Sequence, residues 1–200
     1  MKAVVATRAT GIDAHRCLAT SLVADCFEFI RRGVTTLEVK SGYGLSTAAE
    51  LKQLSAIAEA QAEVPIELAP CFLGAHAIPR EHREDRARYV DLVCEEMIPQ
   101  VAARGLASYC DVFCDRGAFT VEEARRVLTA GAAHGLTPRI HADEITDAGA
   151  AALAAEVGAA SADHLEHTPP EALRAMAAAG VVGVLMPAVN LFLGTTAHLA

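Results

Sequence analysis

Six short apolar runs alternate with helical patterns along the chain. The runs are rich in β-branched and other apolar residues, and they occupy residues 33–42, 64–76, 109–114, 137–142, 160–165 and 180–187. Between them, apolar side chains recur at helical spacing. Each connection is long enough to hold a helix, which favours parallel strands joined by right-handed crossovers. The pattern predicts an α/β fold, either a doubly wound open sheet or part of a (β/α)8 barrel.

Local signals predict where several of the helices begin and end. Residues 12–32 are predicted to form a helix ahead of the first strand. Thr120, with Glu123 three residues later, predicts a capping box at the start of another helix. Asp147 and Gly158 flank an alanine-rich segment, so we expect Asp147 to be the N-cap of a helix that ends near Gly158.

Composition excludes several classes of protein. A net charge of −8 makes the chain a poor candidate for binding a nucleic-acid backbone. No apolar run is long enough to cross a bilayer, and we identify no signal peptide, so no membrane partner is expected. The six cysteines form no CxxC pair and are predicted to be reduced thiols in a cytoplasmic protein. No linker divides the chain, so residues 1–200 are expected to form a single domain. The absence of a glycine-rich phosphate motif disfavours a nucleotide-binding open sheet.

Polar side chains gather where the predicted strands end. Active sites of parallel barrels lie at the carboxyl ends of the strands. A lone histidine there usually packs or caps, but five polar endings in succession predict side chains that converge on one pocket. The endings contain Lys40, Ser41 and Tyr43; His76; Asp115; His141, Asp143 and Glu144; and Asp163, His164 and His167.

The residue types in these endings favour metal-assisted hydrolysis. Imidazole and carboxylate ligands suit a borderline metal such as zinc or iron. A bound metal activates water near neutral pH and polarises a carbonyl group. A carboxylate three residues after a ligating histidine, as Glu144 is after His141, can handle the proton of that water.

Several motifs together resemble one family of enzymes. They are LEVKSGYGL (37–45), CFLGAHAIPREHR (71–83), DLVCEEMIPQVA (91–102), CDVFCD (110–115), RIHADEI (139–145) and SADHLEH (161–167). In this order they resemble imidazolonepropionase, a metal-dependent amidohydrolase of histidine degradation. The resemblance implies a distorted (β/α)8 barrel, of which this chain would supply about six βα units. It also implies one zinc or iron ion, and a homodimer as the assembly of the complete enzyme.

The resemblance also implies a reaction and a role for five residues. The reaction is hydrolysis of the cyclic amide of 4-imidazolone-5-propanoate, a small-molecule substrate, to N-formimidoyl-L-glutamate. His141 resembles the metal-ligand histidine, and Glu144 resembles the catalytic acid that handles the proton and contacts the substrate. His164 resembles the catalytic histidine that orients the water or polarises the carbonyl. Tyr43 and His76 resemble substrate-binding residues.

Other interpretations remain open at this stage. Asp143 competes with Glu144 for the role of proton-handling acid. The family carries a His-x-His metal pair on its first barrel strand and a metal-binding aspartate on its last. This sequence contains no His-x-His, so we expect the central part of such a barrel without those two strands. The alternatives are another cyclic-amide amidohydrolase or deaminase, and a non-catalytic α/β fragment.

Overall fold

The computed structural model describes residues 12–194 as strands and helices that alternate in sequence. The strands are β1 (Thr36–Lys40), β2 (Glu67–Ala75), β3 (Tyr109–Cys114), β4 (Thr137–Ala142), β5 (Ser161–His164) and β6 (Val182–Val184). The helices are α2 (Ile12–Arg31), α3 (Thr47–Gln61), α4 (Arg86–Leu92), α5 (Ile98–Ala103), α6 (Val121–Ala133), α7 (Ala150–Glu156), α8 (Pro170–Ala179) and α9 (Pro187–Leu193). A 3-10 turn lies at Arg80–His82, and a π-helical turn at Val93–Met97 joins α4 to α5.

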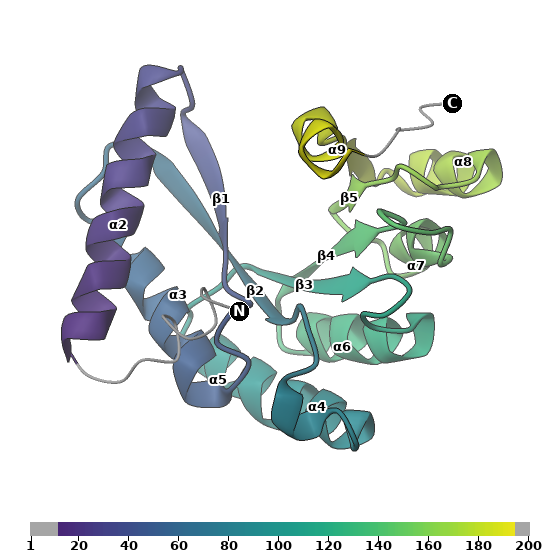
Figure 1. The fold of residues 1–200 in the computed structure, drawn as a ribbon, viewed down its shortest axis with the longest axis horizontal. Coiled ribbons are helices and arrows are strands. Elements are labelled where there is room, and N and C mark those ends of the chain that lie inside the picture. Colours follow the sequence, from purple (N-terminus) through teal and green to yellow (C-terminus); the bar gives the residue numbers. More distant parts are fainter. Residues whose placement is uncertain (1–11, 195–200) are drawn as a thin grey trace.

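The described strands form one curled parallel sheet. Their spatial order, β1-β2-β3-β4-β5-β6, is their order in the sequence. Figure 1 shows the sheet bending into a half-barrel, with α3 and α6 among the helices along its convex side. A doubly wound sheet would reverse its strand order at a switch point. The sequential order therefore excludes that alternative and confirms the predicted partial (β/α)8 barrel.

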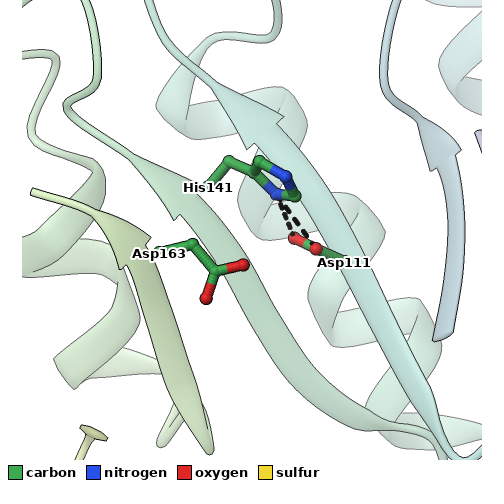
Figure 2. Close-up of side chains that lie close together, drawn as sticks. All are labelled: Asp111, His141 and Asp163. Carbon is green, nitrogen blue, oxygen red and sulfur yellow. Dashed lines mark hydrogen bonds and ion pairs between the residues drawn. The ribbon is translucent and has the colours of Figure 1, made fainter. Parts of the chain in front are cut away.

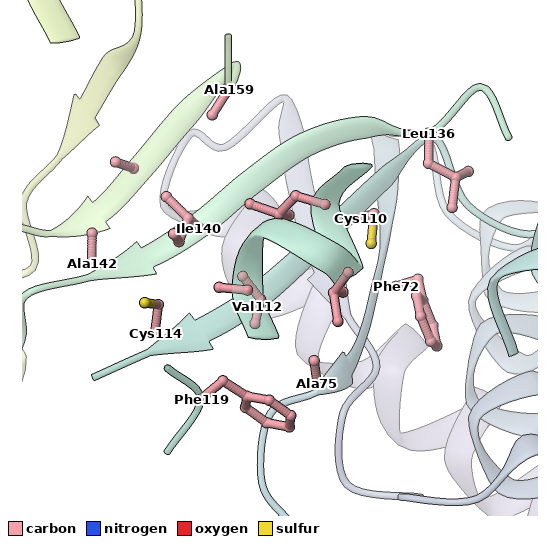
Figure 3. Close-up of a cluster of buried hydrophobic side chains, with 14 of the residues drawn as sticks. Phe72, Ala75, Cys110, Val112, Cys114, Phe119, Leu136, Ile140, Ala142 and Ala159 are labelled. Carbon is pink, nitrogen blue, oxygen red and sulfur yellow. The ribbon is translucent and has the colours of Figure 1, made fainter. Parts of the chain in front are cut away.

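The convex face of the sheet packs against the helices and forms the hydrophobic core. Side chains alternate between the two faces of a strand. On β3, this places Cys110, Val112 and Cys114 towards the helices, where each is fully buried (Figure 3). Both cysteines are therefore small core residues.

The concave face carries charged and polar side chains. On β3, Asp111 lies between Cys110 and Val112 and faces the opposite side of the sheet from them. There it lies beside His141 of β4 and Asp163 of β5 (Figure 2). In the strand register Phe113 pairs with His141, and His141 pairs with Asp163. The parallel register therefore brings functional groups from distant parts of the sequence to one face.

The predicted capping box is confirmed at the start of α6. The Thr120 hydroxyl accepts a hydrogen bond from the Glu123 backbone N–H, and the Glu123 carboxylate accepts one from the Thr120 N–H. The helix predicted at residues 12–32 is also present, as α2.

The predicted N-cap at Asp147 is wrong. Helix α7 begins at Ala150, and its N-cap is Gly149. The carboxylate that accepts the first backbone N–H groups belongs to Asp143, which reaches Ala150 and Ala151. Spacing along the sequence favours a nearby cap, whereas the loop folds back and brings a more distant carboxylate to the helix end.

Within residues 12–194, none of the helices has both the length and the apolar composition that crossing a bilayer requires.

Replacing Thr120 with alanine should lower the free energy of unfolding by about 1 kcal/mol, because the first turn of α6 loses its side-chain acceptor. Thr120→Ser should recover most of this loss. Urea denaturation followed by circular dichroism measures both variants. Equal stability of Thr120→Ala and the wild type would show that the cap contributes nothing.

Candidate active site

A buried carboxylate shapes the loop that carries Tyr43. Glu50 of α3 is fully buried. Its oxygens accept hydrogen bonds from the backbone N–H groups of Gly42, Gly44 and Leu45 at 2.9, 2.8 and 2.7 Å. Buried N–H groups without an acceptor are costly, so Glu50 stabilises this one loop conformation. Tyr43 lies between the held residues.

Gly42 allows this loop to approach β2 closely. Its φ angle is +116°, and a β-carbon there would lie 2.8 Å from the Leu73 carbonyl oxygen. Its own carbonyl oxygen lies 3.2 Å from Nδ1 of His76, which therefore donates this hydrogen bond. The Tyr43 and His76 rings meet edge to face, with centroids 4.9 Å apart. The SGYG segment thus positions both predicted substrate-binding residues.

The predicted site residues form one continuous group at the carboxyl edge of the sheet. The His76 and His141 ring centroids are 6.2 Å apart, and those of His141 and His164 are 5.5 Å apart. Nε2 of His164 lies 3.5 Å from the Glu144 carboxylate. The structure therefore brings Tyr43, His76, His141, Glu144 and His164 together; their roles remain predictions.

The two acids that follow His141 have different surroundings. Asp143 is fully buried, and its carboxylate accepts hydrogen bonds from the N–H groups of Ala148, Ala150 and Ala151 and from the Thr168 hydroxyl. It therefore fixes the loop and the start of α7. The Glu144 carboxylate, beside His164, is the one directed to the ring cluster. This geometry favours Glu144 over Asp143 as the acid that handles protons.

Strained backbone accompanies these residues. Asp143 and His164 have φ angles of +52° and +80°, in the left-handed region that residues other than glycine rarely adopt. Such conformations persist where the surrounding contacts enforce them, and they cluster at functional sites. A second carboxylate supports the loop, since Asp115 accepts hydrogen bonds from the Ile145 N–H and the Thr146 hydroxyl, both at 2.7 Å.

A buried ion-pair network lies deeper on the concave face. Nζ of Lys40 is 2.7 Å from Oδ2 of Asp111 and 2.7 Å from Oδ2 of Asp163. The Asp111 side chain is fully buried, and that of Asp163 is 2% exposed. Sequence reasoning missed Asp111 altogether. The sequence did offer one indication: Asp111 is an acidic residue inside the otherwise apolar run 109–114, which is predicted to be a strand that neighbours two strands with polar ends.

Asp111 also determines the state of the predicted metal ligand. Nδ1 of His141 donates to the Asp111 carboxylate at 3.1 Å (Figure 2), which leaves Nε2 as the nitrogen available to another group. Burial alone would lower the pKa of His141, but the charge and hydrogen bond of Asp111 outweigh it and raise that pKa. Burial would likewise raise the pKa of Asp111, yet His141 and Lys40 hold it well below its ordinary value.

His76 experiences the opposite influence. Burial, followed by the nearby charge of His141, lowers the pKa of His76. The ring is therefore neutral near pH 7, with Nδ1 as the donor to Gly42 and Nε2 as an acceptor. A neutral His76 beside a more basic His141 gives this edge two imidazoles with different proton affinities.

The donor set on the concave face partly fits a metal ion. Ligand atoms of Asp111, His141 and Asp163 all lie within 4.8 Å of one another. However, both carboxylates already bind the Lys40 ammonium. While these ion pairs are intact, Nε2 of His141 is the remaining donor for a metal. The His141 ring is held through its other nitrogen, Nδ1, by Asp111, which is the support that metal-ligating histidines typically have.

A pocket of about 540 Å³ adjoins the ring cluster. His76 and Phe113 form part of its wall, and it is also lined by Arg83, Arg86 and Arg116. Arg86 forms an ion pair with Glu123, whereas Arg83 and Arg116 are exposed. This pocket therefore presents positive charge next to an imidazole.

Comparison with solved structures defines the class of fold. Guanine deaminase from C. acetobutylicum matches with a TM-score of 0.64 at 14% identity, over 92% of this chain and 46% of that one. Adenine deaminase from Arthrobacter aurescens matches with a TM-score of 0.63 at 16% identity, over 94% and 62% of the two chains. The half-barrel therefore shares its fold with the barrels of these two deaminases.

Curated relatives identify the family within this class. Imidazolonepropionase from Geobacillus thermodenitrificans is 56% identical over 169 residues, 84% of this chain and 40% of that protein. The Brevibacillus brevis protein of the same name is 49% identical over 187 residues, 94% of this chain and 44% of that protein. No family model matches the sequence. The chain belongs to the imidazolonepropionase family and spans about two-fifths of the length of these relatives.

Replacing Glu50 with alanine should destabilise the protein by about 3 kcal/mol or more, because three buried N–H groups lose their acceptor. Glu50→Gln, which keeps one acceptor oxygen, should lose less. Amide hydrogen exchange of Gly42, Gly44 and Leu45 should accelerate in both variants. Glu63→Ala, at an exposed position after α3, is the control and should change stability by less than about 0.5 kcal/mol. Unaltered exchange in Glu50→Ala would contradict the role given to Glu50.

Asp111→Asn should lower the free energy of unfolding at pH 7 by about 3–5 kcal/mol, because it breaks a buried ion pair. The pKa of Asp111 is depressed in the folded state, so its stabilisation is present above its unfolded pKa and is lost as the pH falls below that value. The variant should therefore lose less stability than the wild type below about pH 4.

Chemical denaturation across pH 3–7, followed by circular dichroism, measures both effects of Asp111→Asn. The control is Asp91→Asn, since Asp91 forms an exposed pair with Arg126 and should contribute less than about 1 kcal/mol. Parallel acid limbs in the wild type and Asp111→Asn would contradict the assignment.

Proposed function

We propose that the protein to which this chain belongs hydrolyses the cyclic amide of 4-imidazolone-5-propanoate to N-formimidoyl-L-glutamate, a step of histidine degradation. The observation that carries this proposal is the continuous group of Tyr43, His76, His141, Glu144 and His164 at the carboxyl edge of the sheet. Identities of 49–56% to imidazolonepropionases support this substrate over those of the deaminases, whose likeness lies in the fold.

We propose that Nε2 of His141 is one ligand of a single zinc or iron ion. Its support by Asp111 favours this role. A four-coordinate site needs further ligands, which would come from segments of the relatives' length that this chain does not span. A bound ion would supply Lewis-acid polarisation of the scissile carbonyl and activation of water.

Glu144 is proposed to handle the protons of the reaction, and His164 to assist it without transferring a proton. Glu144 takes a proton from the attacking water as the new C–O bond forms, and it returns a proton to the ring nitrogen as the C–N bond breaks. His164, 3.5 Å from Glu144, orients this carboxylate and polarises the carbonyl. Atoms balance, because the water oxygen ends on the carbonyl carbon and its proton ends on the departing nitrogen.

Tyr43 and His76 are proposed to bind the substrate. The edge-to-face pair offers a phenol hydroxyl and a neutral imidazole beside the reacting groups. The propanoate arm needs a positively charged partner, and Arg83 and Arg116 in the adjoining pocket provide one. A planar ring with an anionic arm thus matches the chemistry of the two neighbouring surfaces.

We further propose a cytoplasmic location, a homodimer and no nucleic-acid partner. The six cysteines are all free thiols, which is typical of a reducing compartment. The net charge of −8 disfavours a phosphate backbone as partner. The homodimer rests on the family resemblance alone.

The experiment follows the loss of the ring's ultraviolet absorbance with metal-supplemented protein that includes this chain. Glu144→Gln should lower kcat by a factor of about 10²–10⁴, because the proton-transfer group is removed. KM should change little, and the control Glu63→Gln should retain full activity. Absence of ring opening by the metal-loaded wild type would overturn the proposed reaction. Full activity of Glu144→Gln would instead assign the proton transfer to another residue.

A further inference from the structure

The ion-pair network contains a set of donors that resembles a second metal site. Asp111, His141 and Asp163 each place a donor atom within 4.8 Å of the other two. Nδ1 of His141, rather than Nε2, lies at Asp111. Two carboxylates and an imidazole nitrogen form a donor set that divalent zinc, cobalt and manganese readily accept. Lys40 nevertheless contacts both carboxylates from within this set.

We propose that Lys40 is a resident cation whose ammonium occupies the position between Asp111 and Asp163 and thereby keeps metal ions out of that position. Metal binding on this face is then confined to Nε2 of His141. Lys40 acts through the two aspartates, so it is a positioning residue and does not need to touch the substrate.

Burial and charge support this role. The Asp111 and Asp163 side chains are almost completely buried, and two such carboxylates require a cation between them. An ammonium tethered to β1 is always present at that position, whereas a free metal ion must first be captured from solution. The equal 2.7 Å contacts show that Lys40 bridges the carboxylates rather than pairing with one.

Neighbouring charges hold Lys40 in place. Glu38, two residues earlier on β1, lies 3.4 Å from the Lys40 ammonium and 2.6 Å from the Arg139 guanidinium. Arg139 in turn stacks on the Tyr109 ring, 3.8 Å from its centroid. Lys40 is therefore also held by the ion pair between Glu38 and Arg139. This arrangement opposes its withdrawal from the aspartates.

Exclusion of metal from this position has a consequence for His141. Asp111 accepts the hydrogen bond from Nδ1 of His141 at Oδ1 while its other oxygen, Oδ2, contacts the Lys40 ammonium. A metal at the Lys40 position would compete for both Asp111 and Nδ1, and it would turn the imidazole away from the orientation that presents Nε2. Lys40 thus selects which nitrogen of His141 is offered. The inference concerns metal selection and holds whatever substrate the protein hydrolyses.

The test compares the wild-type chain with Lys40→Met, a variant of similar length without the charge. Each protein is freed of metal, titrated with Co²⁺ and followed by visible absorption. Lys40→Met should bind one more equivalent of Co²⁺ than the wild type, with a new d–d absorption band. Zn²⁺ should raise the Tm of Lys40→Met more than that of the wild type.

Two controls locate the additional ion. Lys40→Met/Asp163→Asn removes one carboxylate of the donor set and should lose the extra equivalent. Lys40→Arg retains a cation and should bind no more Co²⁺ than the wild type. Equal Co²⁺ binding by Lys40→Met and the wild type would overturn the proposal, as would an extra equivalent that survives Asp163→Asn.

Folding of the variant provides a second measurement. If Lys40→Met does not fold when metal-free, it is refolded with Zn²⁺ and with EDTA in parallel. Recovery with Zn²⁺ alone supports the proposal, and failure under both conditions overturns it. Loss of wild-type metal in His141→Ala tests the proposed ligand separately, so the two proposals can fail independently.

Discussion

Two buried carboxylates that share one ammonium are the constraint on which the concave face depends. Asp111 and Asp163 come from β3 and β5, and Lys40 comes from the end of β1. Removing Lys40 leaves two buried carboxylates without the cation they share, which costs far more than an exposed pair contributes. The network therefore ties three strands together at one depth. His141 and Lys40 together keep Asp111 anionic, and this carboxylate holds the His141 ring in one orientation.

Buried carboxylates also hold the two loops that carry Tyr43 and Glu144. The Glu50 carboxylate accepts hydrogen bonds from the backbone N–H groups on either side of Tyr43. The Asp143 carboxylate accepts them from the first N–H groups of α7, the helix that follows the loop carrying Glu144. In both loops, a buried acid satisfies backbone donors that would otherwise be orphaned. The acids that shape the site are thus distinct from the acid that faces the ring cluster. Of two adjacent acids, Asp143 thus holds the loop, and Glu144 is left beside His164, where we propose that it handles protons.

The sequence predicted what depends on local periodicity. The six strands and the Thr120 capping box follow from spacing within a few residues, and parallel strands necessarily bring their polar ends to one edge. The partners of Lys40 were not predictable in this way. They lie 71 and 123 residues away, and only the curvature of the sheet decides which inward side chains meet. Asp147 was mistaken for a cap because a folded-back loop is invisible to local spacing.

The ion pairs around Lys40 limit where a ligand can bind on the concave face. Around Lys40, each cation meets a carboxylate, so an incoming ligand would have to break an ion pair to bind there. At the carboxyl edge, by contrast, the imidazoles contact one another as rings, and Nε2 of His141 remains a donor without a competing cation. A ligand that approaches Nε2 of His141 therefore breaks none of the ion pairs of Lys40. The paired charges of the interior thus leave the strand ends as the less saturated part of this face, which is where parallel barrels carry their active sites.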